Sequence, residues 1–379
     1  MRGWWVVLAA AVAAAAALAL LAADHMGGHG GAAAGASGRF VEVVDALGRR
    51  VRVPANVSRV VAVGPGALRI VVYLGAWDRV VGVEAVEKRW GPAGRPYVMA
   101  HPELLSLPVV GPGGPGRAPD PEGIMSVRPD VVLATFLTRE VADRLQRETG
   151  VPVVVLGSPV LTSLGDLEGF YRALRLAGRV LGREARAEEL VSYVEGLVSD
   201  IRGRVEGVAF NGSVYVGGVG FRGKHGLTST WCRFPVFELL GVESVVDRAG
   251  CGRPGHVEVD REFLLRYDPG VVFIDENGLF LVLEDYRRDP GFYEWLSAFR
   301  LGRVYGLLPF NYYATNYELA LADAYYVGKV LFPDRFRDVD PAAKADEIMG
   351  FFVGKGLYRE LAERYGGFGR LELSRLACG

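Results

Sequence analysis

Several residue types are scarce in this sequence, and each scarcity excludes a class of protein. Three cysteines among 379 residues are too few for a disulfide-rich scaffold. The 43 Lys and Arg residues are balanced by 44 Asp and Glu residues, so there is no basic field for nucleic acid. Lysine is rare, and Gln146 is the only glutamine. That usage is typical of a hot habitat or of a GC-rich genome.

Common catalytic motifs are also missing. There is no nucleophile elbow, no His-Glu-x-x-His and no Cys-x-x-Cys. His101 and His256 each stand among turn residues without a partner at metal-ligand spacing, and His25 and His29 lie in a low-complexity stretch that solvation explains better than metal binding. The sequence therefore predicts no enzyme, no catalytic residue, no metal site and no tightly bound cofactor.

The N-terminus contains the one long apolar run. Residues 4–23 follow Arg2 without a charge, and residues 24–39 form a Gly- and Ala-rich linker. Twenty apolar residues can cross a membrane as a helix. Arg2 and the many Ala residues also fit a cleavable signal peptide, although the run is long for one. A retained anchor or a signal peptide would each export the chain, and we expect it on the extracellular face of the cytoplasmic membrane.

Two segments in the rest of the chain repeat a pattern of helix end, Pro turn and all-apolar strand. They span residues 124–135 and 264–275, and a weaker echo relates residues 74–81 to residues 240–246. Apolar strands that alternate with helices indicate parallel sheets covered on both faces. The predicted fold class is α/β, with two Rossmann-like lobes.

A helical stretch without strand signals separates the two repeats. Five apolar residues recur at spacings of four, three, four and four, which places them on one helix face: Leu190, Val194, Leu197, Ile201 and Val205. We expect one long helix over residues 184–204 that joins the lobes. The predicted parts are an N-terminal lobe (40–163), a helical linker (164–207), a C-terminal lobe (208–365) and a loosely ordered tail (366–379).

Ligands of open α/β sheets bind beyond the carboxyl ends of the strands, so the loops there are candidate binding sites. The segment Gly64-Pro65-Gly66 follows a strand over 60–63 and is either a ligand-contacting backbone or an ordinary tight turn. Arg89 and Trp90 offer a cation and a flat apolar face to an anionic planar ligand, unless their loop is simply solvated. Phe136, after the strand over 131–135, completes this first-lobe set.

The second lobe contains the richest loop, after a strand over 213–216. Its candidate ligand-binding residues are Gly220, Phe221, Arg222, Lys224, His225 and Trp231. The glycines lack the third position of a dinucleotide fingerprint, so the alternative is a glycine-rich surface loop. Tyr312, Tyr313 and Asn316 follow a strand over 304–307 and form either a binding lip or a helix cap packed on the sheet. Cys232 and Cys251 are close enough in sequence to form a disulfide after export, or remain two thiols.

The order of these motifs resembles the substrate-binding proteins of ABC importers for iron–siderophore complexes, haem and cobalamin, in an archaeal-like branch. The matching segments are residues 44–54, 58–61, 74–75, 80–83, 128–132, 224–230, 235–238 and 315–326. The resemblance implies two lobes on a rigid helix, a ligand in the cleft, and permease and ATPase subunits as partners of a monomer. The absence of a lipid-accepting Cys before the domain and the length of the loop around His225 depart from simple members.

The resemblance also implies one exposed glutamate per lobe that docks onto arginines of the permease. In this family the docking glutamates lie just after a strand, at the start of the next helix. Glu140, after the strand over 131–135, fits that place in the first lobe. Glu284, after the strand over 271–275, is chosen in the second, with Glu276 as its rival; each is otherwise a plain surface carboxylate. The expected ligand is a metal chelate, first a ferric siderophore-like complex and next a corrinoid. The alternatives are an extracellular sensor or adhesin on the same fold, and an enzyme on a chelatase-like scaffold.

Overall fold

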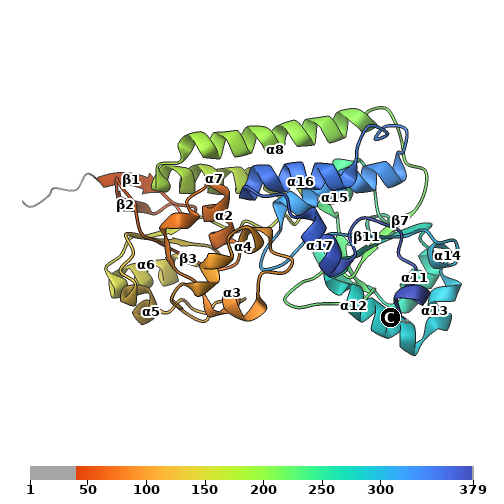
Figure 1. The fold of residues 1–379 in the computed structure, drawn as a ribbon, viewed down its shortest axis with the longest axis horizontal. Coiled ribbons are helices and arrows are strands. Elements are labelled where there is room, and N and C mark those ends of the chain that lie inside the picture. The colour runs from red at the N-terminus through yellow and green to blue at the C-terminus, as the bar shows by residue number, and fades with distance from the viewer. Residues whose placement is uncertain (1–39, 378–379) are drawn as a thin grey trace, which may run out of the picture. The chain divides into compact units, whose positions relative to one another are not determined.

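The computed structural model describes residues 40–377 (Figure 1). The predicted anchor or signal over 4–23 and the linker over 24–39 lie outside the described residues. Within residues 40–377, no helix has both the length and the apolar character needed to cross a membrane.

The first lobe is built on a parallel sheet in the order β4-β3-β5-β6. Its strands are β3 (Val60–Val63), β4 (Val80–Gly82), β5 (Val131–Ala134) and β6 (Val153–Val155), and an antiparallel pair, β1 (Phe40–Val44) and β2 (Arg50–Pro54), precedes them. Its helices are α2 (Ala67–Tyr73), α3 (Ala85–Trp90), α4 (Pro96–Ala100), α5 (Pro121–Ser126) and α6 (Arg139–Thr149). Every residue of β3, β5 and β6 is buried, as expected for strands covered on both faces.

The second lobe repeats this plan with a parallel sheet in the order β11-β10-β7. Its strands are β7 (Val214–Gly217), β10 (Val271–Asp275) and β11 (Val304–Leu307), with an antiparallel ribbon of β8 (Ser229–Cys232) and β9 (Gly255–Glu258). Its helices are α9 (Pro235–Leu239), α10 (Val245–Arg248), α11 (Arg261–Tyr267), α12 (Glu276–Arg288), α13 (Pro290–Trp295) and α14 (Ser297–Arg300). The two-lobed α/β fold that the repeat predicted is confirmed.

Helices connect the lobes (Figure 1). The chain passes from the first lobe to the second through α7 (Leu167–Leu181) and α8 (Glu184–Val205). After β11 it continues through α15 (Tyr317–Leu331), through α16 (Pro341–Val353), which contacts α2 and α4 of the first lobe, and through α17 (Tyr358–Tyr365), which packs on α12 of the second. The long helix predicted over 184–204 is confirmed as α8, and its five predicted core residues are buried. Arg186, near one end of α8, donates to the carbonyl of Tyr73 in the first lobe, while Arg204, at the other, pairs with Asp338. The connection is therefore anchored at both ends.

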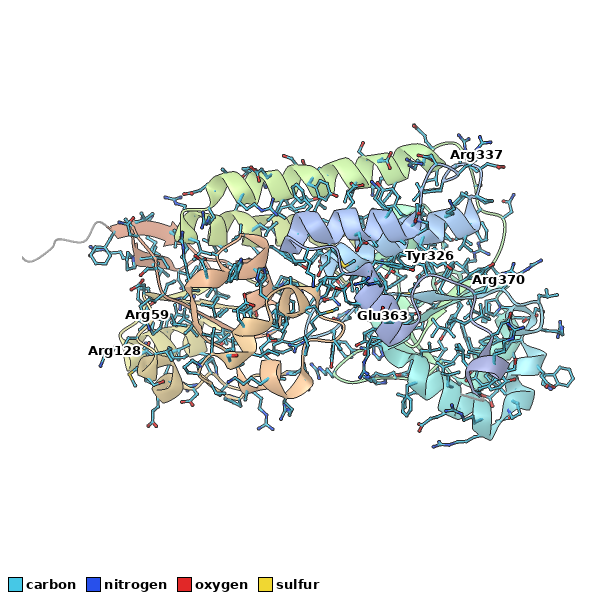
Figure 2. All side chains as sticks on the ribbon, in the orientation of Figure 1. Arg59, Arg128, Tyr326, Arg337, Glu363 and Arg370 are labelled. Atoms are coloured by element: carbon cyan, nitrogen blue, oxygen red, sulfur yellow. A yellow bond between two sulfur atoms is a disulfide. The ribbon has the colours of Figure 1, made fainter. Side chains whose placement is uncertain are left out.

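The C-terminal segment is ordered, so the loosely ordered tail predicted from its composition is wrong through residue 377. The amide of Gly306 in β11 donates to Gly369, and the amide of Leu371 donates to Val304. This pairing covers the free edge of β11, buries Leu371 and is followed by α18 (Leu373–Leu376). Figure 2 labels Arg370 in this segment and Tyr326 on α15, whose ring stacks on Phe368.

Candidate functional site

Tyr313 joins the second lobe to the carboxyl edge of the first sheet. Its hydroxyl donates to Oε2 of Glu84 (2.7 Å) and accepts from the amide of Gly114 (2.9 Å). Glu84 follows β4, and its Oε1 accepts from the amide of Gly64 at the end of β3 (3.1 Å). Burial raises the pKa of Glu84 to about 7, although both hydrogen bonds act to lower it. The predicted turn Gly64-Pro65-Gly66 therefore takes part in an inter-lobe network.

The rest of the predicted binding lip contacts protein as well. Asn316 is fully buried; its Oδ1 accepts from Arg69 (2.7 Å), and its Nδ2 donates to the carbonyl of Gly94 (3.0 Å). The ring of Tyr312 stacks on Trp90 with centroids 5.7 Å apart. Asn316, Tyr312 and Tyr313 thus bind the first lobe, and these contacts leave Asn316 without a surface for a solute.

Trp231 lies in the core. The side chain is 1 % exposed, and its indole N–H donates to the carbonyl of Thr162 in the first lobe (2.9 Å). The predicted role of Trp231 as a stacking face for ligand therefore has no open ring face here. Its position follows from strand alternation, because β8 turns this side chain toward Phe310 and the junction between the lobes.

Other predicted residues remain open to solvent. The loop between β7 and β8 packs against the start of α12. It exposes the side chains of Phe221, Arg222 and Lys224. Gly220 is buried within this loop, and its carbonyl accepts from Asn311. In the first lobe, Arg89 and Phe136 are exposed, and Phe136 has a left-handed backbone with φ 56°. Each lobe therefore presents one exposed aromatic side chain beyond the carboxyl end of a strand.

His256 is not solitary, which corrects the sequence interpretation that found no metal-ligand set. Oε1 of Glu258 lies 3.2 Å from Nδ1 of His225 and 3.5 Å from Nε2 of His256. His256 and Glu258 are two residues apart on β9 and therefore share one face of the strand. That spacing was readable in the sequence; the approach of His225, which depends on the fold of the preceding loop, was not.

The two predicted docking glutamates differ in setting. Glu140 is fully exposed in the first turn of α6. Glu284 is half-buried, lies about two turns into α12 and lines a hollow of about 280 Å³ with Arg261 and Arg288. The rival Glu276 is buried and accepts a hydrogen bond from the amide of Gly367, and burial raises its pKa to about 9. Glu276 therefore offers no exposed carboxylate to a partner.

The second lobe also holds a disulfide. Cys232 at the end of β8 is bonded to Cys251, with their Cα atoms 5.8 Å apart. The bridge closes the segment that contains α9 and α10 and fixes it to the ribbon. Of the two alternatives that the sequence left open, the structure contains the bridged one.

Comparison with known proteins agrees with this architecture. The sequence profile of a family described as periplasmic binding protein matches residues 60–309. A curated relative, the molybdate-binding protein MolA of Haemophilus influenzae, is 24 % identical over 320 residues, which is 79 % of this chain and 86 % of MolA.

Solved structures show the same fold. MolA bound to molybdate aligns with a TM-score of 0.66 and 20 % identity, covering 83 % of this chain and 98 % of MolA. A periplasmic solute-binding protein from Veillonella parvula aligns with a TM-score of 0.68 and 18 % identity, covering 86 % of this chain and 97 % of that protein. Helicobacter pylori CeuE with Ni(II) bound aligns with a TM-score of 0.59 and 16 % identity, covering 83 % of this chain and 96 % of CeuE.

Proposed function

The chain belongs to the periplasmic binding protein family, and we propose that it is the substrate-binding protein of an ABC importer, not an enzyme, with a chelated metal ion as its ligand. A ferric siderophore-like complex ranks first and a corrinoid second. In this proposal the loop between β7 and β8 makes the principal contacts, and the captured complex passes to the permease.

One observation carries the proposal: the loop after β7 combines exposed groups that suit the different parts of a chelate. Phe221 offers an exposed aromatic ring with one face stacked on His256, Arg222 and Lys224 offer positive charge, and the half-buried His225 offers an imidazole that can coordinate a metal. Phe136 supplies a second exposed aromatic side chain at the matching edge of the first lobe. Flat apolar faces next to cations would accommodate an organic chelator with anionic donors.

A small oxyanion is the second candidate. The relative MolA is described as a molybdate-binding protein, and the exposed Arg222 and Lys224 would attract such an anion. An oxyanion makes no use of the exposed Phe221, however, because it has no apolar surface to bury. The aromatic side chain is what favours a chelate.

A thermal-shift screen tests the choice. The full chain is melted with ferric siderophores, haem, cobalamin, cobinamide or molybdate, because a ligand that binds only the folded state raises the melting temperature. We expect one chelate class to give a saturable shift that Phe221→Ala reduces and that Phe40→Ala, a control at another exposed Phe, leaves unchanged. A shift with molybdate alone would select the oxyanion, and no shift with any compound would contradict the proposal.

The membrane context is part of the proposal. The apolar run over 4–23 would anchor the protein at the extracellular face, where Glu140 and Glu284 would dock onto the permease. If the run is an anchor, a chain that begins at residue 24 should leave the membrane fraction for the soluble fraction. If expression of the full-length sequence instead yields a shortened protein in the soluble fraction, the run is a cleaved signal peptide.

A further inference from the structure

Three side chains of the second lobe converge on one point. One donor atom from each of His225, His256 and Glu258 lies within 4.8 Å of the other two. Metal–nitrogen and metal–oxygen bonds of about 2.1 Å place neighbouring donors roughly 3 to 3.5 Å apart. The two distances to Glu258 Oε1, 3.2 and 3.5 Å, already have this length. Small rotations of the two rings would complete the set.

The hydrogen bonds of His225 fix which nitrogen is available. Its Nε2 lies 2.8 Å from the carbonyl oxygen of Phe221, which can only accept, so Nε2 carries the proton. In the neutral ring, Nδ1 is then a lone pair, and it faces the carboxylate of Glu258. Two acceptors at this distance need a cation between them or a second proton on the ring. A backbone carbonyl that holds the opposite N–H is also the usual support of a metal-ligating histidine.

His256 is held in place in a similar way. The ring of Phe221 stacks on it with centroids 4.6 Å apart and an angle of 12°. Nε2 of His256 lies 2.8 Å from the hydroxyl of Ser229. Because that hydroxyl donates its one proton to the carbonyl of Val219, it accepts from Nε2–H of His256. A metal ion that binds Nε2 would replace that proton, and the hydroxyl of Ser229 would keep its hydrogen bond to Val219. Phe221 therefore positions both rings, one through its carbonyl and one through its side chain.

The cluster lies near the junction of the lobes and is open to solvent. His256 stands on β9 beside Gly255, which approaches Thr162 of the first lobe. The side chains of His225, His256 and Glu258 are 34 %, 13 % and 49 % exposed. Three protein donors leave coordination positions free, and the exposure allows water or a small chelator to fill them.

We propose that His225, His256 and Glu258 bind a first-row transition-metal ion directly, through two imidazole nitrogens and one carboxylate. Such mixed N and O donors suit Fe, Ni, Cu and Zn better than Mg²⁺ or Ca²⁺. The site would hold the metal of the transported complex while its chelator occupies the free positions. This role as a cargo site rests on the proposed function; the binding of an ion does not.

Metal titration of the full chain tests the site. His25→Ala and His29→Ala are introduced first, and no affinity tag is left, so that residues 101, 225 and 256 are the remaining histidines. We expect one equivalent of Ni²⁺ or Zn²⁺ by calorimetry and a Co²⁺ absorption spectrum with nitrogen ligation. His225→Ala and His256→Ala should each weaken binding at least 100-fold, and Glu258→Gln at least 10-fold. His101→Ala, at a histidine that stacks on Trp77 in the first lobe, should change nothing.

A supporting variant separates coordination from folding. Phe221→Ala keeps all three ligands and removes the ring that stacks on His256, so we expect a 10- to 100-fold loss of affinity with unchanged stoichiometry. Unfolding curves of every variant should stay cooperative. Absence of an equimolar site, or equal affinity in His225→Ala, His256→Ala and the parent, would overturn the inference.

The outcomes also separate this inference from the proposed function. A chelate or oxyanion that binds the parent and the two histidine variants equally would leave the importer assignment intact and exclude a role of the metal site in cargo binding. If the protein binds the metal ion but no complex in the thermal-shift screen, the metal site stands and its role in capturing cargo is excluded.

Discussion

The hydroxyl of Tyr313 donates to Oε2 of Glu84 at 2.7 Å, and these two residues belong to different lobes. Glu84 also accepts from Gly64, and Tyr313 accepts from Gly114, so the pair continues into the first lobe on both sides. This buried contact fixes the carboxyl edge of the first sheet against the segment that precedes α15.

Tyr313→Phe should destabilise the protein. The change leaves Oε2 of Glu84 and the amide of Gly114 without a partner in a buried setting, which costs about 1 to 3 kcal/mol of unfolding free energy. Tyr312→Phe is the matched control, because the hydroxyl of Tyr312 has no hydrogen-bond partner within residues 40–377. Urea unfolding measures both variants, and equal losses would contradict the role given to the Tyr313 hydroxyl.

Stability should fall as the pH rises from about 4.5 to 7. Burial raises the folded-state pKa of Glu84 to about 7 from an ordinary 4.5, so the folded state binds the proton more tightly than the unfolded state. Ionisation of Glu84 above pH 7 therefore lowers the unfolding free energy by about 3 kcal/mol. Asp275, with a pKa of about 7, acts in the same direction. Glu84→Gln should flatten the decrease in unfolding free energy between pH 5 and 8, and an unchanged slope would refute the assignment.

Breaking the disulfide should lower stability. Cys232 and Cys251 are 19 residues apart, and a bridge of this span restricts the unfolded chain by about 3 kcal/mol. Cys251→Ser should therefore reduce the unfolding free energy, and a reducing agent should have no further effect on that variant. Cys378→Ser is the control. Titration of three free thiols in denatured, non-reduced protein would show that the bridge does not form.

Charge reversal at the docking glutamates should stop transport without changing ligand binding. Glu140→Arg and Glu284→Arg would meet permease arginines with like charge, which costs affinity at an interface. Uptake by cells that express the importer measures the loss, and calorimetry checks the ligand. Glu148→Arg and Glu294→Arg, at exposed positions on α6 and α13, are the controls. Normal uptake by both reversed variants would exclude the docking role.

Strands and long helices could be predicted because their patterns are local. Val-rich runs predicted β3 and β5 with nearly their observed limits, and the spacing of Leu190, Val194 and Ile201 predicted α8. The C-terminal segment could not be predicted, because its order comes from pairing with β11 and from the ring of Phe368, both distant contacts.

The candidate site was predicted less well, since the burial of a loop residue depends on the whole fold. Trp231 and Asn316 have the residue types that bind ligands, yet the structure uses them to join the lobes. The opposite happened to His256, which has no partner nearby in sequence except Glu258 and meets His225 only after the loop folds.

Calorimetry with one chelator, with and without its metal, tests the central claim most directly. The chelate that gives the largest thermal shift is titrated into the full chain, followed by the metal-free chelator and by molybdate. If the ligand is a metal chelate, the chelate should bind at one saturable site. The metal-free chelator and molybdate should each bind at least 100-fold more weakly. Equal affinity for the metal-free chelator, or tighter binding of molybdate, would contradict the account.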